Sequence, residues 1–356
     1  MAASLAAPAR AADQVILGAV LPLTGSSATV GEDQRRGIEL AVEYINSRGG
    51  VLGKSLKVII EDSGGRAASA IDAATKLASV DKVPVIIGEY SSGITIPMGQ
   101  YLVRQGVVHI NPGSSSPKVR DIGEYSFSVM GLDDLAGRFT ADKIFKQGFR
   151  KAVFLAPNNA YGEGVTTQVA KAFTALGGTV VGTVLYTEGQ STYRRELEQL
   201  AKAAPDVYVY TAYGQESAVI NREAFELGLN KTPWFGIYLT MCTSDSAPET
   251  VRGQTGIEVN YIGPDGGWYK KLYEDKYHQP FTTTFSGYTF DAVNIAVAAI
   301  KKANSTDPAA IRDALKQVAA SYVGVTGPLA MDGQRQRAHQ PFLSVKYVDK
   351  AVETIN

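Results

Sequence analysis

The chain has 356 residues, which is long for a single core and favours two domains. Lysine plus arginine and aspartate plus glutamate both number 35, so the net charge is zero and offers no basic field for nucleic acid or an anionic membrane. The single cysteine, Cys242, excludes an internal disulfide and cysteine-rich metal sites, and the three histidines are too widely separated to match a metal-ligand spacing.

The first residues of the chain are rich in alanine. Within them, Ala9-Arg10-Ala11 resembles the small-residue site at which export signals are cleaved. We therefore interpret residues 1–12 as the remnant of an export signal, which predicts an exported protein. No apolar run reaches the roughly 20 residues that are needed to cross a bilayer.

Strand-like and helical patterns then alternate along most of the chain. Apolar strand-like runs lie at 15–20, 55–61, 84–87 and 107–110, then at 152–156, 179–185, 207–210 and 234–237. Apolar stripes with helical spacing lie at 38–45, 71–78, 165–176, 193–201 and 220–227. The alternation pauses only near Gly131, and so it predicts two successive α/β units with parallel sheets.

A different pattern follows Gly263-Pro264. Three helical stripes lie at 269–273, 293–300 and 311–318, and a turn follows at 325–328. Residues 342–348 alternate like a closing antiparallel strand.

Two neighbouring strand ends carry small hydroxyl residues. Gly88 ends one apolar run and is followed by Glu89, Tyr90, Ser91 and Ser92; the next run ends at Ile110 and is followed by a loop that contains Gly113, Ser114 and Ser115. The carboxyl ends of adjacent parallel strands meet at one crevice, where helix N-termini also favour an anion. Serine and glycine are equally common in ordinary turns, so each loop alone leaves both readings open. The two together favour a binding crevice.

The order of the motifs resembles the periplasmic solute-binding proteins of branched-chain-amino-acid (Leu/Ile/Val-binding) type, which serve ATP-driven importers. The matching segments are L-P-L-T-G, A-V-E-Y-I-N-S-R-G-G-V-L-G-K, I-I-G-E-Y-S-S-G, N-P-G-S-S-S-P, Y-G-E-G, Y-T-F-D-A-V-N-I-A and V-T-G-P-L. Each is weak alone, but all seven occur in the family's order.

The resemblance implies a type I periplasmic-binding fold, with two Rossmann-like lobes joined by three crossovers near Gly131, Ile262 and Pro328. One lobe would hold residues 13–131 and 263–329, and the other residues 132–262 and 330–356. The ligand would be trapped between the lobes when they close about the crossovers.

The resemblance also implies site residues. Ser92, Gly113 and Ser115 occupy the positions that hold the ligand carboxylate, and Ser91 and Ser114 lie beside them. Tyr161 and Tyr213 occupy second-lobe positions that close over the ligand. Tyr238 stands where amino-acid binders carry the acid that holds the α-ammonium.

Because Tyr238 is not acidic, two classes of ligand stay open. One is an aromatic or hydroxylated carboxylic acid, which the tyrosines would stack against and hydrogen-bond. The other is an aliphatic or branched-chain amino acid, if Glu89, Asp245 or another acid supplies the missing charge. The absence of an acid at 238 favours the first class slightly, since an unpaired ammonium is costly to bury.

No enzyme motif accompanies the fold: the chain lacks G-x-G-x-x-G after its first strand, the P-loop pattern and the G-x-S-x-G elbow. We therefore expect a non-enzyme with no cofactor and no metal. The expected partners are a small carboxylate ligand and the permease and ATPase subunits of an importer, with the protein itself a monomer. A sensing module of a signalling system with the same fold is the alternative.

Overall fold

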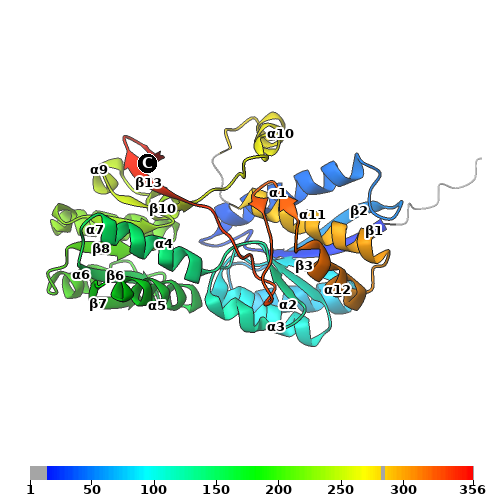
Figure 1. Cartoon of the computed structure of the whole chain (residues 1–356), viewed down its shortest axis with the longest axis horizontal. Coiled ribbons are helices and arrows are strands. Elements are labelled where there is room, and N and C mark those ends of the chain that lie inside the picture. The colour runs from blue at the N-terminus through cyan, green and yellow to red at the C-terminus, as the bar shows by residue number, and fades with distance from the viewer. Residues whose placement is uncertain (1–13, 282–284, 356) are drawn as a thin grey trace, which may run out of the picture.

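The computed structural model describes residues 14–281 and 285–355. Two α/β lobes lie side by side along the long axis of the molecule (Figure 1). This arrangement confirms the predicted fold class. The interpreted export-signal remnant, residues 1–12, lies outside the described residues. Within the described part of the chain, no helix is long and apolar enough to cross a membrane.

The first lobe is built on a five-stranded parallel sheet in the order β2-β1-β3-β4-β5. Its strands are β1 (Gln14–Leu21), β2 (Ser55–Asp62), β3 (Val85–Gly88), β4 (Val108–Asn111) and β5 (Ser126–Ser128). Every residue of β3 and β4 is buried, because helices cover both faces of the sheet. One face packs against α1 (Ala28–Asn46), α11 (Ser286–Ala303) and α12 (Pro308–Val318), and the other against α2 (Ala67–Ser79) and α3 (Ser92–Arg104). The 3₁₀ helix η1 (Pro117–Ile122) packs beside α3.

The second lobe is built on a seven-stranded sheet in the order β14-β13-β10-β9-β8-β6-β7. Its strands are β6 (Lys151–Pro157), β7 (Thr179–Tyr186), β8 (Val207–Tyr210), β9 (Trp234–Ile237), β10 (Thr255–Val259), β13 (Phe342–Val348) and β14 (Ala351–Ile355). The last two strands are antiparallel, as the alternation at 342–348 predicts for β13. The helices are α4 (Asp133–Lys146), α5 (Ala160–Ala175), α6 (Arg194–Ala201), α7 (Gly214–Glu226), η2 (Leu229–Lys231), α8 (Leu239–Thr243) and α9 (Pro248–Val251).

The two sheets share one connection pattern. In each, the chain starts on an inner strand, adds one strand on one side and then returns across it, giving β2-β1-β3 and β7-β6-β8. The loops after β1 and β3, and those after β6 and β8, therefore diverge at the carboxyl ends of the strands. Open α/β sheets bind ligands at such switch points.

The chain crosses between the lobes three times. After β10 it returns to the first lobe through α10 (Gly267–Tyr277), and α11 then packs along α1 and against β3 and β4. A short hairpin, β11 (Val323–Gly324) and β12 (Gly327–Pro328), follows α12. Gln336 still forms a bridge to Ser128 of β5. The third crossing therefore lies after residue 336, later than the predicted position near Pro328, and the segment then runs to β13 (Figure 1).

Candidate functional site

A cavity of about 1200 Å³ lies between the lobes at the carboxyl ends of the strands. Six of the sequence-predicted site residues line it. Three belong to the first lobe and three to the second: Ser92, Gly113 and Ser115, and Tyr161, Tyr213 and Tyr238. The structure thus brings together residues that are up to 146 positions apart (238 minus 92). Their roles in binding remain predictions.

The first-lobe wall of the cavity is polar. Ser92 is the first residue of α3, directly after β3, and Ser115 follows β4. The Ser92 hydroxyl accepts a hydrogen bond from the backbone N–H of Ser116 at 3.2 Å, which ties the two loops together. Because α3 begins at the cavity wall, the positive end of its dipole favours an anion there.

Glu89, Ser91 and Ser114 do not line the cavity and instead hold its loops. The fully buried Glu89 carboxylate accepts hydrogen bonds from Ser63 Oγ at 2.6 Å, Tyr90 N at 2.9 Å and Ser91 N at 2.8 Å. Ser114 Oγ donates to the backbone oxygen of Tyr90 at 2.9 Å. The expectation that Glu89 supplies a charge to a ligand is therefore at odds with its position behind the loop.

The second-lobe wall is aromatic. Tyr161, at the start of α5, shares a 2.8 Å hydrogen bond with Thr211 Oγ1. Its ring centroid lies 6.0 Å from that of Tyr213 and 6.4 Å from that of Tyr238. Burial raises the pKa of all three phenols well above the ordinary value, so they stay protonated and act as neutral donors.

The aromatic lining of the cavity continues onto the first lobe with Tyr90 and Phe285, which the sequence analysis missed. Tyr90 comes from the first lobe, yet its hydroxyl donates to Met241 Sδ of the second lobe at 3.1 Å. Its ring lies 6.1 Å from that of Tyr213 and 5.0 Å from that of Phe285. The two lobes therefore touch across the cavity. Tyr90 lies between Glu89 and Ser91 in a loop that the sequence analysis had already assigned to the site, so its place in the cavity could have been predicted.

A buried acid, Asp133, lies beside the cavity at the start of α4. Its backbone N–H donates to Ser115 O at 2.7 Å, and neither carboxyl oxygen has a hydrogen-bond partner of good geometry among the described residues. Burial raises the pKa of Asp133 to about 8, and the nearby Ser115 hydroxyl only partly offsets it. Tyr161 and Tyr238 lie within its electrostatic range. The acidic pair Asp133-Asp134 shortly after Gly131 is visible in the sequence, but the sequence analysis assigned it no role.

We expect Asp133→Asn to stabilise the empty protein increasingly as the pH rises. A carboxyl with a raised folded-state pKa binds more protons when folded than unfolded between its two pKa values, so wild-type stability falls from about pH 4 to about pH 8. Asparagine removes this loss, and the melting temperatures of variant and wild type should diverge by a few degrees over that window. Asp142→Asn, which removes a half-exposed carboxylate paired with Lys146 on the same helix, is the control; a pH-independent difference for Asp133→Asn would contradict the expectation.

Among the described residues, four acids line the cavity: Glu32 and the buried Asp33 of the first lobe, and Asp245 and Glu258 of the second. Asp245 is exposed at its edge, and Glu258 is buried on β10. The sequence analysis considered Asp245 as a source of charge but did not identify Glu258. Within the described ranges, no group of three or more His, Cys, Asp or Glu side chains is arranged to hold a metal ion.

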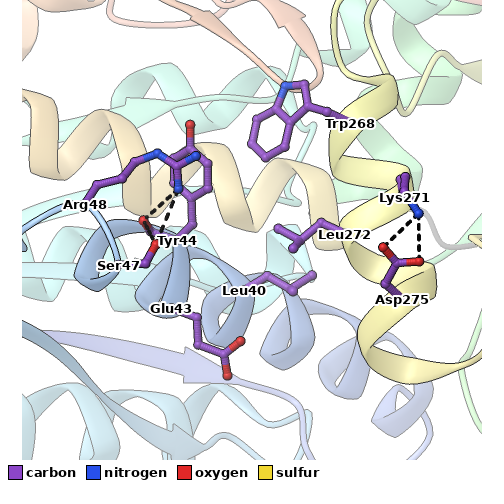
Figure 2. A pocket seen from close by; sticks show the side chains of 9 residues that line it. All are labelled: Leu40, Glu43, Tyr44, Ser47, Arg48, Trp268, Lys271, Leu272 and Asp275. Atoms are coloured by element: carbon purple, nitrogen blue, oxygen red, sulfur yellow. Dashed lines mark hydrogen bonds and ion pairs between the residues drawn. The ribbon is translucent and has the colours of Figure 1, made fainter.

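A second pocket, of about 400 Å³, lies on the outside of the first lobe between α1 and α10 (Figure 2). Leu40 of α1 and Leu272 of α10 lie at its floor, and the rings of Tyr44 and Trp268 stack with centroids 5.0 Å apart. The Arg48 guanidinium lies 3.7 Å from the Tyr44 ring centroid. None of the predicted site residues lines this pocket, so the interlobe cavity is the candidate site.

Comparison with known proteins gives the same architecture. A family model described as periplasmic binding protein matches residues 14–351. The Leu/Ile/Val-binding protein homolog 1 of Brucella abortus (strain 2308) is 27% identical over 344 residues, covering 93% of this chain and 90% of its own length.

Two solved structures are similar in fold over 96% of this chain. One is the branched-chain amino acid transporter substrate binding protein LivJ of Streptococcus pneumoniae in complex with isoleucine, with a TM-score of 0.83, 21% identity and 99% of its own chain covered. The other is an ABC transporter solute binding protein of R. palustris in complex with benzoate, with a TM-score of 0.84, 23% identity and 96% of its own chain covered.

Proposed function

The chain belongs to the periplasmic binding protein family, and from this premise we propose that it is the extracytoplasmic solute-binding subunit of an ABC importer. It captures a small carboxylate-bearing ligand in the interlobe cavity and encloses it by hinge closure. The ligand is an aromatic or hydroxylated carboxylic acid, or an aliphatic or branched-chain amino acid.

One observation carries this proposal: loops from the switch points of both sheets meet at one cavity. Ser92 follows β3 in the first lobe, and Tyr161 and Tyr213 follow β6 and β8 in the second. A ligand that contacts both sets joins the lobes, so its binding energy favours their closed arrangement.

The chemistry of the two walls supports a carboxylate with an apolar or aromatic body. Hydroxyls of Ser92 and Ser115, with the N-terminus of α3, supply charge-assisted hydrogen bonds to an anion. The tyrosines of the second lobe offer ring faces to the rest of the molecule. Isoleucine and benzoate, held by the two proteins of similar fold, are both carboxylates with apolar bodies.

The partners follow from this role. A closed, loaded protein presents one surface of both lobes to a permease, and an ATPase subunit drives uptake on the other side of the membrane. Both similar solved proteins are named as transporter components, which supports the importer role and a periplasmic location. Turnover of the ligand by this chain is not expected.

The test is calorimetry with a panel of aliphatic amino acids and aromatic acids, after a thermal-shift screen. At least one carboxylate should bind with micromolar or tighter affinity. Ser92→Ala should weaken that binding by about 1.5–3 kcal/mol, because a hydrogen bond to a charged group is lost. Ser79→Ala, on the exposed end of α2, is the matched control. The proposal fails if no carboxylate binds, and unchanged affinity in Ser92→Ala removes that residue from the site.

A further inference from the structure

Gln34 is a buried amide on α1 for which the packing of the first lobe gives no reason. The residue is 0% exposed. Neither Oε1 nor Nε2 of its side chain forms a hydrogen bond with another described residue. A glutamine amide offers two donors and an acceptor, and it costs free energy to leave such a group unpaired in the interior. An apolar side chain of the same size would fill this place without that cost.

The Gln34 amide lies directly behind the first-lobe wall of the interlobe cavity. Val30, one turn earlier on the same face of α1, and Asp33, the preceding residue, both line that cavity. A Cβ on Gly113 would lie 3.4 Å from Gln34 Nε2 and 3.2 Å from Tyr90 Cα. Gly113 and Tyr90 also line the cavity. Because residue 113 has no side chain, the amide nitrogen lies against the backbone of a loop that borders the cavity.

The chemistry of this position suits a small neutral group that both donates and accepts hydrogen bonds. Gln34 has no charge with which to offset the burial of an ion, so a charged partner would gain little there. The space around Gly113 is narrow, as the contacts of 3.2 and 3.4 Å show, and it favours a group of one oxygen atom. A hydroxyl is the smallest group that can fill both a donor and an acceptor of the amide.

We propose that Gln34 determines specificity by hydrogen-bonding a hydroxyl of the ligand, so that the cleft prefers hydroxylated carboxylic acids to acids without a hydroxyl. This inference rests on the proposed function and narrows its ligand class. Gly113 and Tyr90 each precede by two residues a serine assigned to the carboxylate, Ser115 and Ser92, and two residues span at most about 7 Å. One small ligand can therefore reach both the serines and the amide. Gln34 does not itself line the cavity, so its amide must turn past Gly113, which its rotatable bonds allow.

A permanently bound water on the amide is the competing explanation, since buried water often satisfies polar groups that lack a protein partner. The two explanations differ in what they predict for pairs of acids that differ only by a hydroxyl. Such pairs are 3-phenyllactate with 3-phenylpropanoate, 2-hydroxy-4-methylpentanoate with 4-methylpentanoate, and 4-hydroxybenzoate with benzoate. Loss of the amide would weaken only the hydroxylated member if the amide binds its hydroxyl. It would treat both members alike if the amide holds only water.

The experiment measures the three pairs by calorimetry in wild type, Gln34→Met and Gln105→Met. Methionine keeps the approximate volume of glutamine but forms no comparable hydrogen bond, and Gln105 is an exposed amide of the same lobe that serves as the control. Wild type should bind at least one hydroxylated acid about 10-fold or more tighter than its counterpart, because the counterpart leaves the amide unpaired. Gln34→Met should reduce this ratio at least about 5-fold and change the counterpart's affinity less than about 3-fold, whereas Gln105→Met should leave the ratio unchanged.

Several outcomes overturn the inference. An unchanged ratio in Gln34→Met, or equal weakening of both members of a pair, assigns the amide to an ordered water or to a structural role. If Gln34→Met does not fold, Gln34→Leu is the second variant, with the same expectation. Wild type that binds amino acids or unhydroxylated acids without any preference for a hydroxyl refutes the inference whatever the variants do, while the proposed function stands. If no carboxylate binds, both fail.

Discussion

Replacing Arg337 by methionine is expected to lower the free energy of unfolding by about 3–5 kcal/mol. Arg337 is 2% exposed and lies where the crossings between the lobes meet. Its guanidinium donates to the backbone oxygens of Val129, Thr326 and His339 at 3.3, 2.8 and 3.1 Å, and to Thr326 Oγ1 at 3.1 Å. Methionine fills a similar volume but leaves these buried acceptors without a donor.

Denaturant unfolding monitored by circular dichroism measures the effect, with Arg138→Met as the control. Arg138 lies on α4 with its side chain 64% exposed, and its ion pair with Asp134 is a surface contact, so its loss should cost less than 1 kcal/mol. A change below about 1 kcal/mol in Arg337→Met would mean that water replaces the guanidinium at the crossings without cost.

The crossings are held by a wider buried network, and this explains how they stay aligned. Gln340 accepts from the backbone N–H of Gly131 at 3.0 Å and donates to the Tyr288 hydroxyl of α11 at 2.5 Å. Asp291, one turn along α11, accepts from Val325 N at 2.7 Å and Thr326 N at 2.9 Å. The first and third crossings and the hairpin before the third are thus anchored on one helix of the first lobe. If the lobes close on a ligand as proposed, we expect these contacts to confine their motion to rotation about the crossings.

The elements with strong periodicity were predictable from the sequence, and those with small or polar buried residues were not. Strands such as Val85–Gly88 and Trp234–Ile237 are apolar because both faces are covered. Helix α4 was missed because its buried face is built from small or polar residues, among them Gly137, Thr140 and Ala141, and gives little hydrophobic contrast. The short strand β5 and strand β10, which contains Glu258, were also missed, because small or polar residues interrupt their apolar runs.

The candidate site divides in the same way. Residues in loops with a recognisable motif, such as Ser92, Ser115 and Tyr161, could be assigned to the cavity from the sequence. Glu89 belongs to the same motif but is turned behind the loop, where three donors hold it, and no sequence pattern reveals that direction. Glu258 and Asp133 reach the site through strand register and a crossing, both of which are tertiary properties.

The close approach of the lobes outside the cavity gives a way to oppose closure without altering any cavity-lining residue. Gly164 lies in the first turns of α5 in the second lobe and faces the start of η1 in the first. A Cβ at this position would lie 2.9 Å from Pro117 Cδ, closer than packed side chains allow, and a tight 3.1 Å from Ser116 Oγ; it would also lie 3.3 Å from Asp133 Oδ2 of its own lobe. The Lys118–Glu163 ion pair at 2.9 Å joins the lobes at the same seam. Gly164 is not among the residues that line the cavity.

We therefore expect Gly164→Leu to weaken the tightest-binding carboxylate of the panel about 100-fold, or about 2.7 kcal/mol. Apparent affinity falls in proportion to the fraction of protein that can close, and a leucine wedged at the seam makes closure rare. Because each lobe keeps its own core, the unfolding free energy should change by less than about 1 kcal/mol. Ala175→Leu, on an exposed part of the same helix, adds bulk away from the seam and should leave the affinity unchanged. Calorimetry measures the affinity, and small-angle scattering should show the Gly164→Leu protein staying extended when ligand is added. Wild-type affinity in Gly164→Leu would show that the ligand is held without the contact between α5 and η1, and that enclosure between the lobes is not what retains it.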